Sequence, residues 1–363
     1  MKFTKILTAS LAFALALGTT FTVDAMARED MAKIKVGKCG NFKYWEKNSE
    51  AKNKLVKYVK NVTKRGSADY IPEDDRIAVF DMDGTLISET TPFYFEWMLY
   101  LDRIYNDPSF KPTPELLAHA EIVKKAIAEH AVTDAIDDME TKDKAIILAG
   151  LNHKDMRAVV HNTMKQPADG MVNLIRGEAF YLPMAEVVAY LQANKFTVYL
   201  VTGAMREIAR VHIDGVLHIK PNNVIGADIM TAMTNQGNTP KGKYVYQRDK
   251  DEVLRTAEVI SANTGVNKVI HIDREIGKQP VLAFGNSSGD YAMFEYTLSK
   301  NKYKSMAFSL CCDDVDREYG NLKKAASMKA MCEKKGWVPV SMRNDWKTIY
   351  GENVTKVAAP TSK

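Results

Sequence analysis

Short apolar runs and amphipathic stretches alternate along this chain. Between Leu55 and Val62, apolar residues recur at helical spacing and predict a helix over 50–64. The unbroken apolar run 77–80 that follows predicts a buried strand. The folded part of the chain is therefore expected to begin with a helix and then a strand without a polar face.

The segment 91–182 shows helical patterns only. A threonine-proline pair at 91–92 is a helix-start signal ahead of an aromatic stripe over 93–104, and a second such pair stands at 113–114. Residues 142–165 also predict a helix. An aromatic stripe at this spacing is more typical of an apolar core than of a ligand site. We therefore expect 91–182 to form a helical cap with its own core.

Beyond residue 183, predicted helices and strands alternate, beginning with a helix over 184–193 and a strand over 197–201. Such alternation predicts a parallel sheet with helices on both faces. We expect an α/β fold, a Rossmann-like parallel-sheet sandwich with an inserted helical cap. The expected core segments are 28–90 and 183–350, with a C-terminal tail over 351–363, and the further predicted strands are 223–229, 280–285 and 305–310.

The first 27 residues carry the pattern of a signal peptide. Lys2 and Lys5 precede a mostly apolar stretch that ends at Ala25-Met26-Ala27, a small-residue cleavage site. Polar residues interrupt that stretch, which favours a cleaved signal over a membrane anchor. No second run of eighteen apolar residues follows. We expect an exported protein, periplasmic or secreted, whose mature form has no membrane span.

Composition and charge narrow the classes of function. The chain of 363 residues is 46% hydrophobic and 26% charged, as in an ordinary globular protein. Its formal net charge of +5 is mild and evenly spread, which argues against a nucleic-acid partner. No pair of cysteines has C-x-x-C spacing, so no zinc site is predicted. Export permits disulfides, and three full connectivities stay open for Cys39, Cys311, Cys312 and Cys332.

Two carboxylates follow the predicted strand 77–80. Asp81 and Asp83 stand two residues apart, so they share one face if the extended backbone continues. Gly84 then allows the chain to turn. An EF-hand calcium loop is excluded, because Pro92 stands where that loop needs a glutamate. A plain turn remains open beside a site at the carboxyl end of a strand, where open α/β sheets place their chemistry.

Three later segments add polar groups in a fixed order. One predicted strand ends in Thr202 and Gly203, and Lys268 opens a short predicted helix. The loop after the strand 280–285 carries Asn286 and Asp290. The chain thus presents a carboxylate pair, a hydroxyl group, a lysine and finally a loop with an amide and an acid.

This order resembles that of the haloacid dehalogenase superfamily of phosphohydrolases, over residues 70–350. The family's D-x-D-x-T motif and its motif with an acid a few residues after G-D/N are quite specific, whereas a lone threonine or lysine is not. The matching residues are Asp81, Asp83 and Thr85 for the first motif, then Thr202, then Lys268, and finally Asn286 and Asp290.

Two late stretches, 314–319 and 344–347, look like the exported, phosphoserine-phosphatase-like branch of that superfamily. One departure stands out, since many relatives carry an aspartate where this chain has Asn286. The resemblance combined with this departure implies a metal site of lower affinity.

The resemblance implies a role for each matched residue. Asp81 is expected to attack phosphorus and form an aspartyl phosphate, while Asp83 protonates the leaving oxygen and then activates water. Thr202 is expected to hydrogen-bond a phosphate oxygen, and Lys268 to neutralise the phosphate and orient Asp81. Lys278 is the competing lysine, but it is predicted to lie at the opposite end of the sheet.

The resemblance also implies Mg²⁺ as the cofactor, a hard ion that takes oxygen ligands. The expected ligands are Asp81, the backbone carbonyl of Asp83, and Asn286 or Asp290.

The substrate is expected to be a small phosphorylated metabolite. Gly203 is expected to bind it beside Thr202. Glu89, where the chain enters the cap, is expected either to receive a cationic leaving group, as in phosphoserine or phosphorylcholine, or to be a solvated turn residue. The alternative function is a non-catalytic phosphate-binding or metal-binding protein that keeps the fold.

Overall fold

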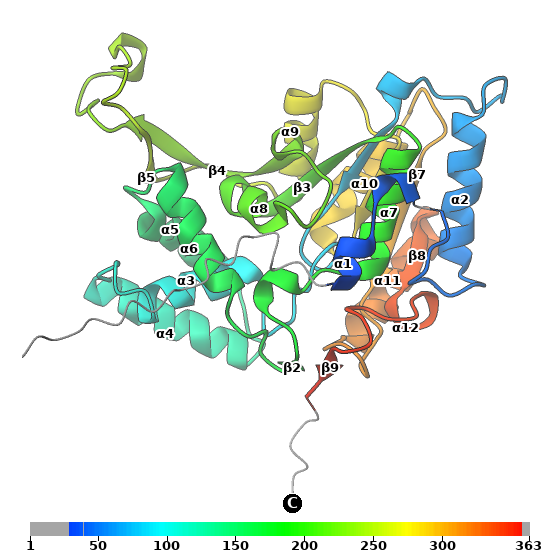
Figure 1. Ribbon diagram of the computed structural model, residues 1–363, viewed down its shortest axis with the longest axis horizontal. Helices are drawn as coiled ribbons and strands as arrows, with labels where there is room; N and C mark the ends of the chain where they lie inside the picture. The colour runs from blue at the N-terminus through cyan, green and yellow to red at the C-terminus, as the bar shows by residue number, and fades with distance from the viewer. Residues whose placement is uncertain (1–28, 39, 358–363) are drawn as a thin grey trace, which may run out of the picture.

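A seven-stranded sheet runs through the middle of the protein in the order β5-β4-β3-β1-β6-β7-β8 (Figure 1). The computed structural model describes residues 29–38 and 40–357, so the predicted signal peptide and Cys39 lie outside the described residues. Every neighbouring pair is parallel except β4 and β5, which confirms the predicted α/β class. The strands are β1 (Ile77–Phe80), β3 (Thr197–Met205), β4 (Val224–Met233), β5 (Val253–Ser261), β6 (Leu282–Gly285), β7 (Met306–Cys311) and β8 (Val338–Ser341).

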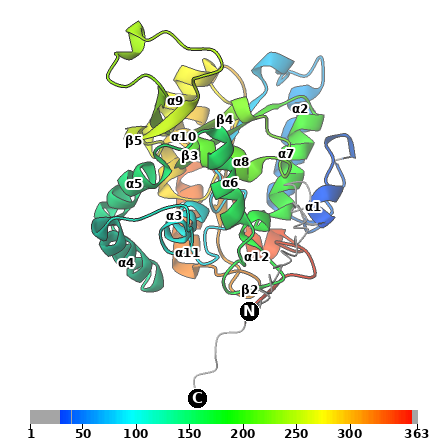
Figure 2. The same cartoon turned by 60° about the vertical axis from the view of Figure 1, so that its left-hand side comes forward.

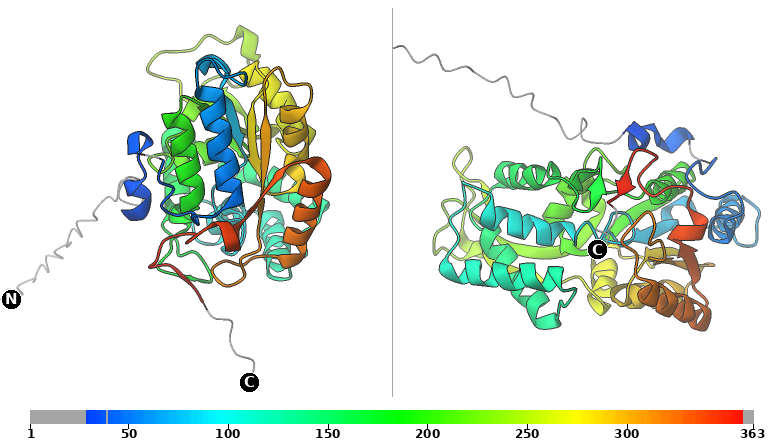
Figure 3. Two further views of the ribbon diagram at one scale, coloured as in Figure 1. Left: turned by 90° about the vertical axis from the view of Figure 1, so that its right-hand side faces the viewer. Right: turned by 90° about the horizontal axis from the view of Figure 1, so that it is seen from below.

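Helices cover both faces of this sheet, as Figure 3 shows. Along β1 the side chains alternate between two apolar clusters: Ala78 and Phe80 pack with the helices of one face, and Ile77 and Val79 with those of the other. Because both faces are covered, the strand is apolar throughout. One face carries α2 (Glu50–Thr63) and α7 (Leu182–Ala193), and the other α9 (Val266–Ile276), α10 (Tyr291–Leu298) and α11 (Leu322–Lys335).

Four helices between β1 and α7 gather at one side of the sheet (Figure 2). They are α3 (Phe95–Tyr105), α4 (Pro114–Ala128), α5 (Asp134–Leu148) and α6 (His153–Met164). The Thr113 side chain caps α4 at the backbone N–H of Leu116, as the second threonine-proline pair predicts. The helical character predicted for this part of the chain is therefore present.

Two details of the helix prediction are wrong. The helix expected to begin at the pair 91–92 begins at Phe95, because the backbone is still extended at Tyr94. The single helix predicted over 142–165 is two helices. The chain breaks between them where Gly150 adopts φ +81° and the Asn152 side chain caps α6.

An antiparallel arm extends the sheet beyond β3. Strand β4 is longer than the predicted 223–229 because its second half pairs with β5, and the loop between them projects from the body (Figures 1 and 2). Neither β5 nor β8 was predicted. β5 is an edge strand with mostly exposed or half-buried residues, so it lacks the apolar run of a buried strand.

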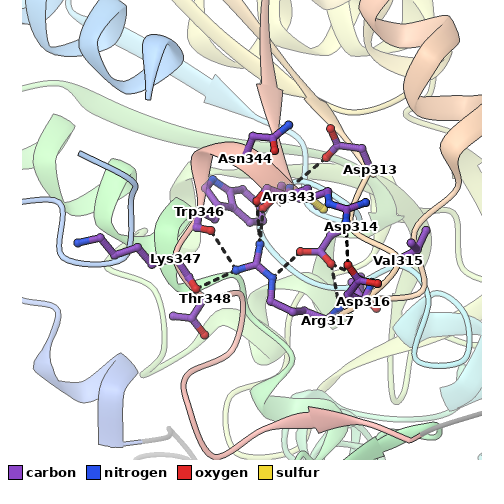
Figure 4. Close-up of polar contacts among 12 residues, drawn as sticks. Asp313, Asp314, Val315, Asp316, Arg317, Arg343, Asn344, Trp346, Lys347 and Thr348 are labelled. Carbon is purple, nitrogen blue, oxygen red and sulfur yellow. Dashed lines mark hydrogen bonds and ion pairs between the residues drawn. The ribbon is translucent and has the colours of Figure 1, made fainter. Parts of the chain in front are cut away.

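The two late stretches of the resemblance meet in space (Figure 4). Arg317 binds the carboxylate of Asp314 at 2.5 Å and donates to the backbone oxygens of Trp346, at 3.0 Å, and Lys347, at 2.8 Å. Arg317 thereby ties the loop after β7 to the segment after α12 (Met342–Asp345). Farther on, β9 (Thr355–Lys356), inside the predicted tail, pairs with β2 (Met171–Val172).

The described cysteines Cys311, Cys312 and Cys332 are free thiols, so no disulfide joins any two of them in the part of the chain that the structure describes. Within residues 29–38 and 40–357, no helix has the length and apolar character needed to cross a membrane.

Candidate active site

The polar residues predicted from the sequence lie at the carboxyl edge of the sheet. In the parallel register Phe80 pairs with Leu200 on one side and with Phe284 on the other. The backbone N–H of Asp81 still donates to the Phe284 oxygen, at 2.9 Å. The chain then leaves the sheet, so the ends of β1, β3 and β6 open at one edge, where open α/β sheets carry their ligand sites.

Lys268 joins two acids at this edge. Its Nζ lies 2.6 Å from Asp81 Oδ1 and 2.7 Å from Asp290 Oδ1, and all three side chains are buried. Burial and the charge of Asp290 raise the pKa of Asp81 to about 7, although Lys268 opposes the shift. The competing Lys278 instead pairs with Asp75 at 2.7 Å, next to the start of β1 and thus at the opposite edge.

The loop after β6 is shaped by Asp290. Its Oδ2 accepts hydrogen bonds from the backbone N–H groups of Asn286, at 2.9 Å, and Ser287, at 3.0 Å. A side chain at Gly285 would place its Cβ 2.5 Å from the Asp290 carboxyl carbon. Both oxygens of Asp290 therefore already have partners, one in Lys268 and one in the loop.

Thr85 connects the nucleophile candidate to the same loop. Its hydroxyl lies 3.3 Å from Asp81 Oδ2 and 3.2 Å from Asn286 Oδ1, so these two oxygens face a common point. The turn that brings them together needs Gly84, which has φ +73°. A Cβ at this position would stand 2.0 Å from Asn286 Nδ2.

Glu89 is buried and paired, which excludes the solvated turn residue considered from the sequence. Its Oε1 lies 2.5 Å from Lys324 Nζ on α11, and its Oε2 accepts from Asn286 Nδ2 at 3.0 Å. An aspartate in place of Asn286 would set two carboxylates against each other here. The lysine also argues against Glu89 as a free receptor for a cationic leaving group, because its charge is already neutralised within the protein.

Asp83 follows β1 and is half-buried. Burial and the charge of Asp81 raise its pKa well above the usual range. Glu96 and Glu89 add to the shift, whereas Lys144 of the cap opposes it. A carboxyl group whose pKa is raised in this direction fits the role of a general acid.

The Thr202 side chain is fully buried, and its Oγ1 accepts from the backbone N–H of Ala204 at 3.0 Å. Thr202 lies just beyond the last β1–β3 register pair, beside the backbone that follows Asp81. Gly203 lies in the same irregular end of β3, where a Cβ would be 3.0 Å from the Thr264 methyl carbon.

The donor set fits a hard divalent cation. Asp81 Oδ2 and Asn286 Oδ1 lie on either side of the Thr85 hydroxyl, and both are oxygen ligands of the kind Mg²⁺ prefers. Around them stand the four carboxylates of Asp81, Asp83, Glu89 and Asp290, whereas the ammonium groups bonded to these acids among the described residues are those of Lys268 and Lys324. A dication would offset this surplus of negative charge. Asp290, with both oxygens bonded, fits a supporting position better than direct coordination.

Comparison with protein families gives one match that covers more than half of the chain. The model of the haloacid dehalogenase-like hydrolases matches residues 76–296, a span that contains every predicted catalytic and metal-binding residue. The chain belongs to the haloacid dehalogenase-like hydrolases. No curated protein matches it.

Several solved structures are similar to this haloacid dehalogenase-like hydrolase at low sequence identity. A protein of unknown function from Anaerococcus prevotii is 13% identical, covers 82% of this chain and 92% of its own, and has a TM-score of 0.49. Cytosolic 5'-nucleotidase IIIB bound to cytidine is 12% identical, with 81% and 86% covered and a TM-score of 0.44. A phosphoserine phosphohydrolase-like protein from Francisella tularensis is 14% identical, with 70% and 99% covered and a TM-score of 0.37.

Three residues beside the site were not predicted from the sequence. Lys324 reaches Glu89 from α11, and Tyr94 stands near the acids, since the charge of Glu89 and burial raise its phenol pKa. Glu318 holds the neighbouring loop through the Thr90 hydroxyl at 2.9 Å. The contacts of Lys324 and Glu318 join residues more than 200 positions apart in the chain, so they leave no local sequence pattern.

Proposed function

We propose that this hydrolase is a Mg²⁺-dependent phosphomonoesterase that works through an aspartyl phosphate. The observation that carries the proposal is the buried contact of Asp81 with Lys268, with Asp290 on the far side of the same ammonium group. This contact fixes one oxygen of Asp81 and leaves the other within 3.3 Å of the Thr85 hydroxyl, which also bonds Asn286. A carboxylate held in this way is preorganised for attack on a phosphorus atom.

The proposed reaction has two steps. Asp81 attacks phosphorus while the bond from phosphorus to the leaving oxygen breaks, and Asp83 gives its proton to that oxygen. Water then attacks the phosphorus of the aspartyl phosphate, Asp83 takes the proton from that water, and phosphate leaves with the Asp81 carboxylate restored.

The remaining groups bind the phosphate and neutralise its charge. Thr202 and Gly203 would hold phosphate oxygens, and Lys268 would offset their charge. Mg²⁺, held by Asp81, the Asp83 carbonyl and Asn286, would supply further charge neutralisation. The helices of the cap would exclude bulk water.

For the substrate we propose a small phosphorylated metabolite with a cationic leaving group, such as phosphoserine or phosphorylcholine. The negative charges of Glu96 and Glu89 near Asp83 support this proposal through their field and not through a binding contact, because Glu89 is already paired with Lys324. Lys324 and Lys144 weaken the field of these acids, so the preference over sugar phosphates is expected to be moderate. Export to the periplasm or outside the cell is proposed with it, on the basis of the sequence alone.

The test is a panel of phosphomonoesters assayed with Mg²⁺ and after exhaustive chelation. Turnover is expected with Mg²⁺, none with EDTA, and none for Asp81→Asn. Near-normal hydrolysis of p-nitrophenyl phosphate by Asp81→Asn would contradict the mechanism, and activity that survives chelation would contradict the metal.

A further inference from the structure

A buried ion cluster joins the helical cap to the end of β3, the strand that contains Thr202. Lys144 Nζ on α5 lies 2.7 Å from Glu96 Oε2 on α3 and 3.1 Å from Glu140 Oε2. All three side chains are buried. The second oxygen of Glu96 accepts the backbone N–H of Met205 at 2.5 Å. One lysine of the cap thus reaches, through one glutamate, the backbone at the end of β3.

The bond to Met205 fixes the last residue of β3. Thr202 Oγ1 accepts the N–H of Ala204 at 3.0 Å, and the next N–H, that of Met205, donates to Glu96. The register with β4 shifts between Val201 and Met205, so residues 202–205 form an irregular end of the strand. A shift of Glu96 would break the bond to Met205 and loosen this strand end, which contains Thr202.

The cluster does not look like a device for stability. Glu140 Oε1 is buried without a hydrogen-bond partner among the described residues, and buried ion clusters often contribute less than an apolar core of the same volume. Its position instead relates it to the candidate site, because Glu96 bonds the amide of Met205, the last residue of the strand that also contains Thr202.

We propose that Lys144 and Glu96 are positioning residues of the reaction. Lys144 holds Glu96, and Glu96 holds the Met205 amide. The packing of the cap helices α3 and α5 and the conformation of residues 202–205 therefore depend on each other. This inference rests on the proposed phosphatase activity. It predicts that loss of Lys144 weakens the binding of the phosphoryl group, although Lys144 touches neither Thr202 nor Asp81 in the structure.

The experiment compares the double variant Glu140→Gln/Lys144→Met with the control Lys142→Met, which changes an exposed lysine on the same helix. Two quantities are measured in each protein with Mg²⁺ present. The first is hydrogen exchange of the backbone segment 203–206, which needs no activity. The second is steady-state hydrolysis of p-nitrophenyl phosphate, with inhibition by inorganic phosphate.

In the double variant we expect exchange of segment 203–206 to rise at least about tenfold, and KM and the inhibition constant of phosphate to rise together by a similar factor, while kcat changes less. The control should match the wild type in both quantities. Wild-type exchange and phosphate inhibition in the folded double variant would overturn the proposal. Absence of phosphatase activity in the wild type would instead refute the proposed function, and the exchange measurement would still decide on the contact.

If the double variant fails to fold, the neutral variant Glu96→Leu/Glu140→Gln/Lys144→Leu removes every charge of the cluster together, a change that buried ion clusters often tolerate. The same rise in exchange and in the phosphate inhibition constant is expected. A triple variant that folds with wild-type values of both would equally overturn the proposal.

Discussion

Replacing Lys268 by methionine should destabilise the protein strongly and in a pH-dependent way. The methionine keeps most of the volume but leaves Asp81 and Asp290 without the ammonium group that lies 2.6 and 2.7 Å from them. Breaking a buried ion pair in this way costs about 3–5 kcal/mol of unfolding free energy. Two buried carboxylates lose their ion-pair partner here, so a destabilisation in the upper part of that range is expected at alkaline pH.

Proton uptake should relieve part of this cost. The pKa of Asp81, already raised to about 7 by burial and by Asp290, must rise further without Lys268. Below that pKa the carboxyl is neutral in the folded state and its repulsion with Asp290 is lost. Each additional unit by which the pKa of Asp81 rises in the folded state lowers the unfolding free energy at alkaline pH by about 1.4 kcal/mol. The stability deficit of Lys268→Met should therefore be small in acid and grow as pH rises.

Urea unfolding of wild type and variant in EDTA, at about pH 5.5 and about pH 8.5, measures both deficits. Lys278→Met is the matched control, since Lys278 pairs with Asp75 on the exposed surface at the opposite edge, and it should leave unfolding and activity close to wild type. Equal deficits for Lys268→Met at both pH values, or a larger effect of Lys278→Met, would refute the reasoning about the buried contact.

Four further outcomes follow from the site. Gly84→Ala should abolish activity, measured as kcat/KM, because the new Cβ would stand 2.0 Å from Asn286 Nδ2 and φ is +73°. Asn286→Asp should lower the melting temperature in EDTA, by repulsion with Glu89 at a 3.0 Å contact, and should lower the Mg²⁺ concentration needed for half-maximal activity; an unchanged metal requirement would exclude Asn286 as a ligand. Without metal, stability should fall as pH rises from about 4 to about 7, since a carboxyl whose pKa is raised in the folded state favours folding only while protonated; Asp81→Asn should make this dependence weaker in urea unfolding, and an unchanged pH dependence would contradict the raised pKa of Asp81. Glu89→Gln should reduce kcat/KM for cationic and for neutral aryl substrates alike, because Glu89 supports Asn286 and Lys324; a loss confined to cationic substrates would show instead that Glu89 binds their leaving group.

The parts of the fold that could be predicted are those encoded locally. The strand before Asp81 is apolar on both faces because helices cover both faces, and that pattern is visible in four consecutive residues. Thr113 caps its helix through a bond three residues away. Asp290 likewise shapes the 285–290 loop by bonds within it, so the loop can be recognised without the rest of the chain.

The parts that could not be predicted depend on distant partners. Glu89 and Lys324 are 235 residues apart, and nothing near either residue indicates the ion pair. The same holds for the amide of Asn286, whose orientation is set by Thr85 on one side and Glu89 on the other. Strand β5 forms because β4 offers a free edge, so its sequence needs only one partly buried face.

The most direct test of the account is the covalent intermediate. Asp83→Asn should retain the nucleophile but lack the group that activates water, so an aryl phosphate with a good leaving group should leave one phosphoryl group on the protein. Intact-mass and peptide mass spectrometry after rapid acid quench should locate it on Asp81. A quenched Asp83→Asn protein without any phosphoryl adduct, or with the adduct on another residue, would contradict the assignment of Asp81 as nucleophile.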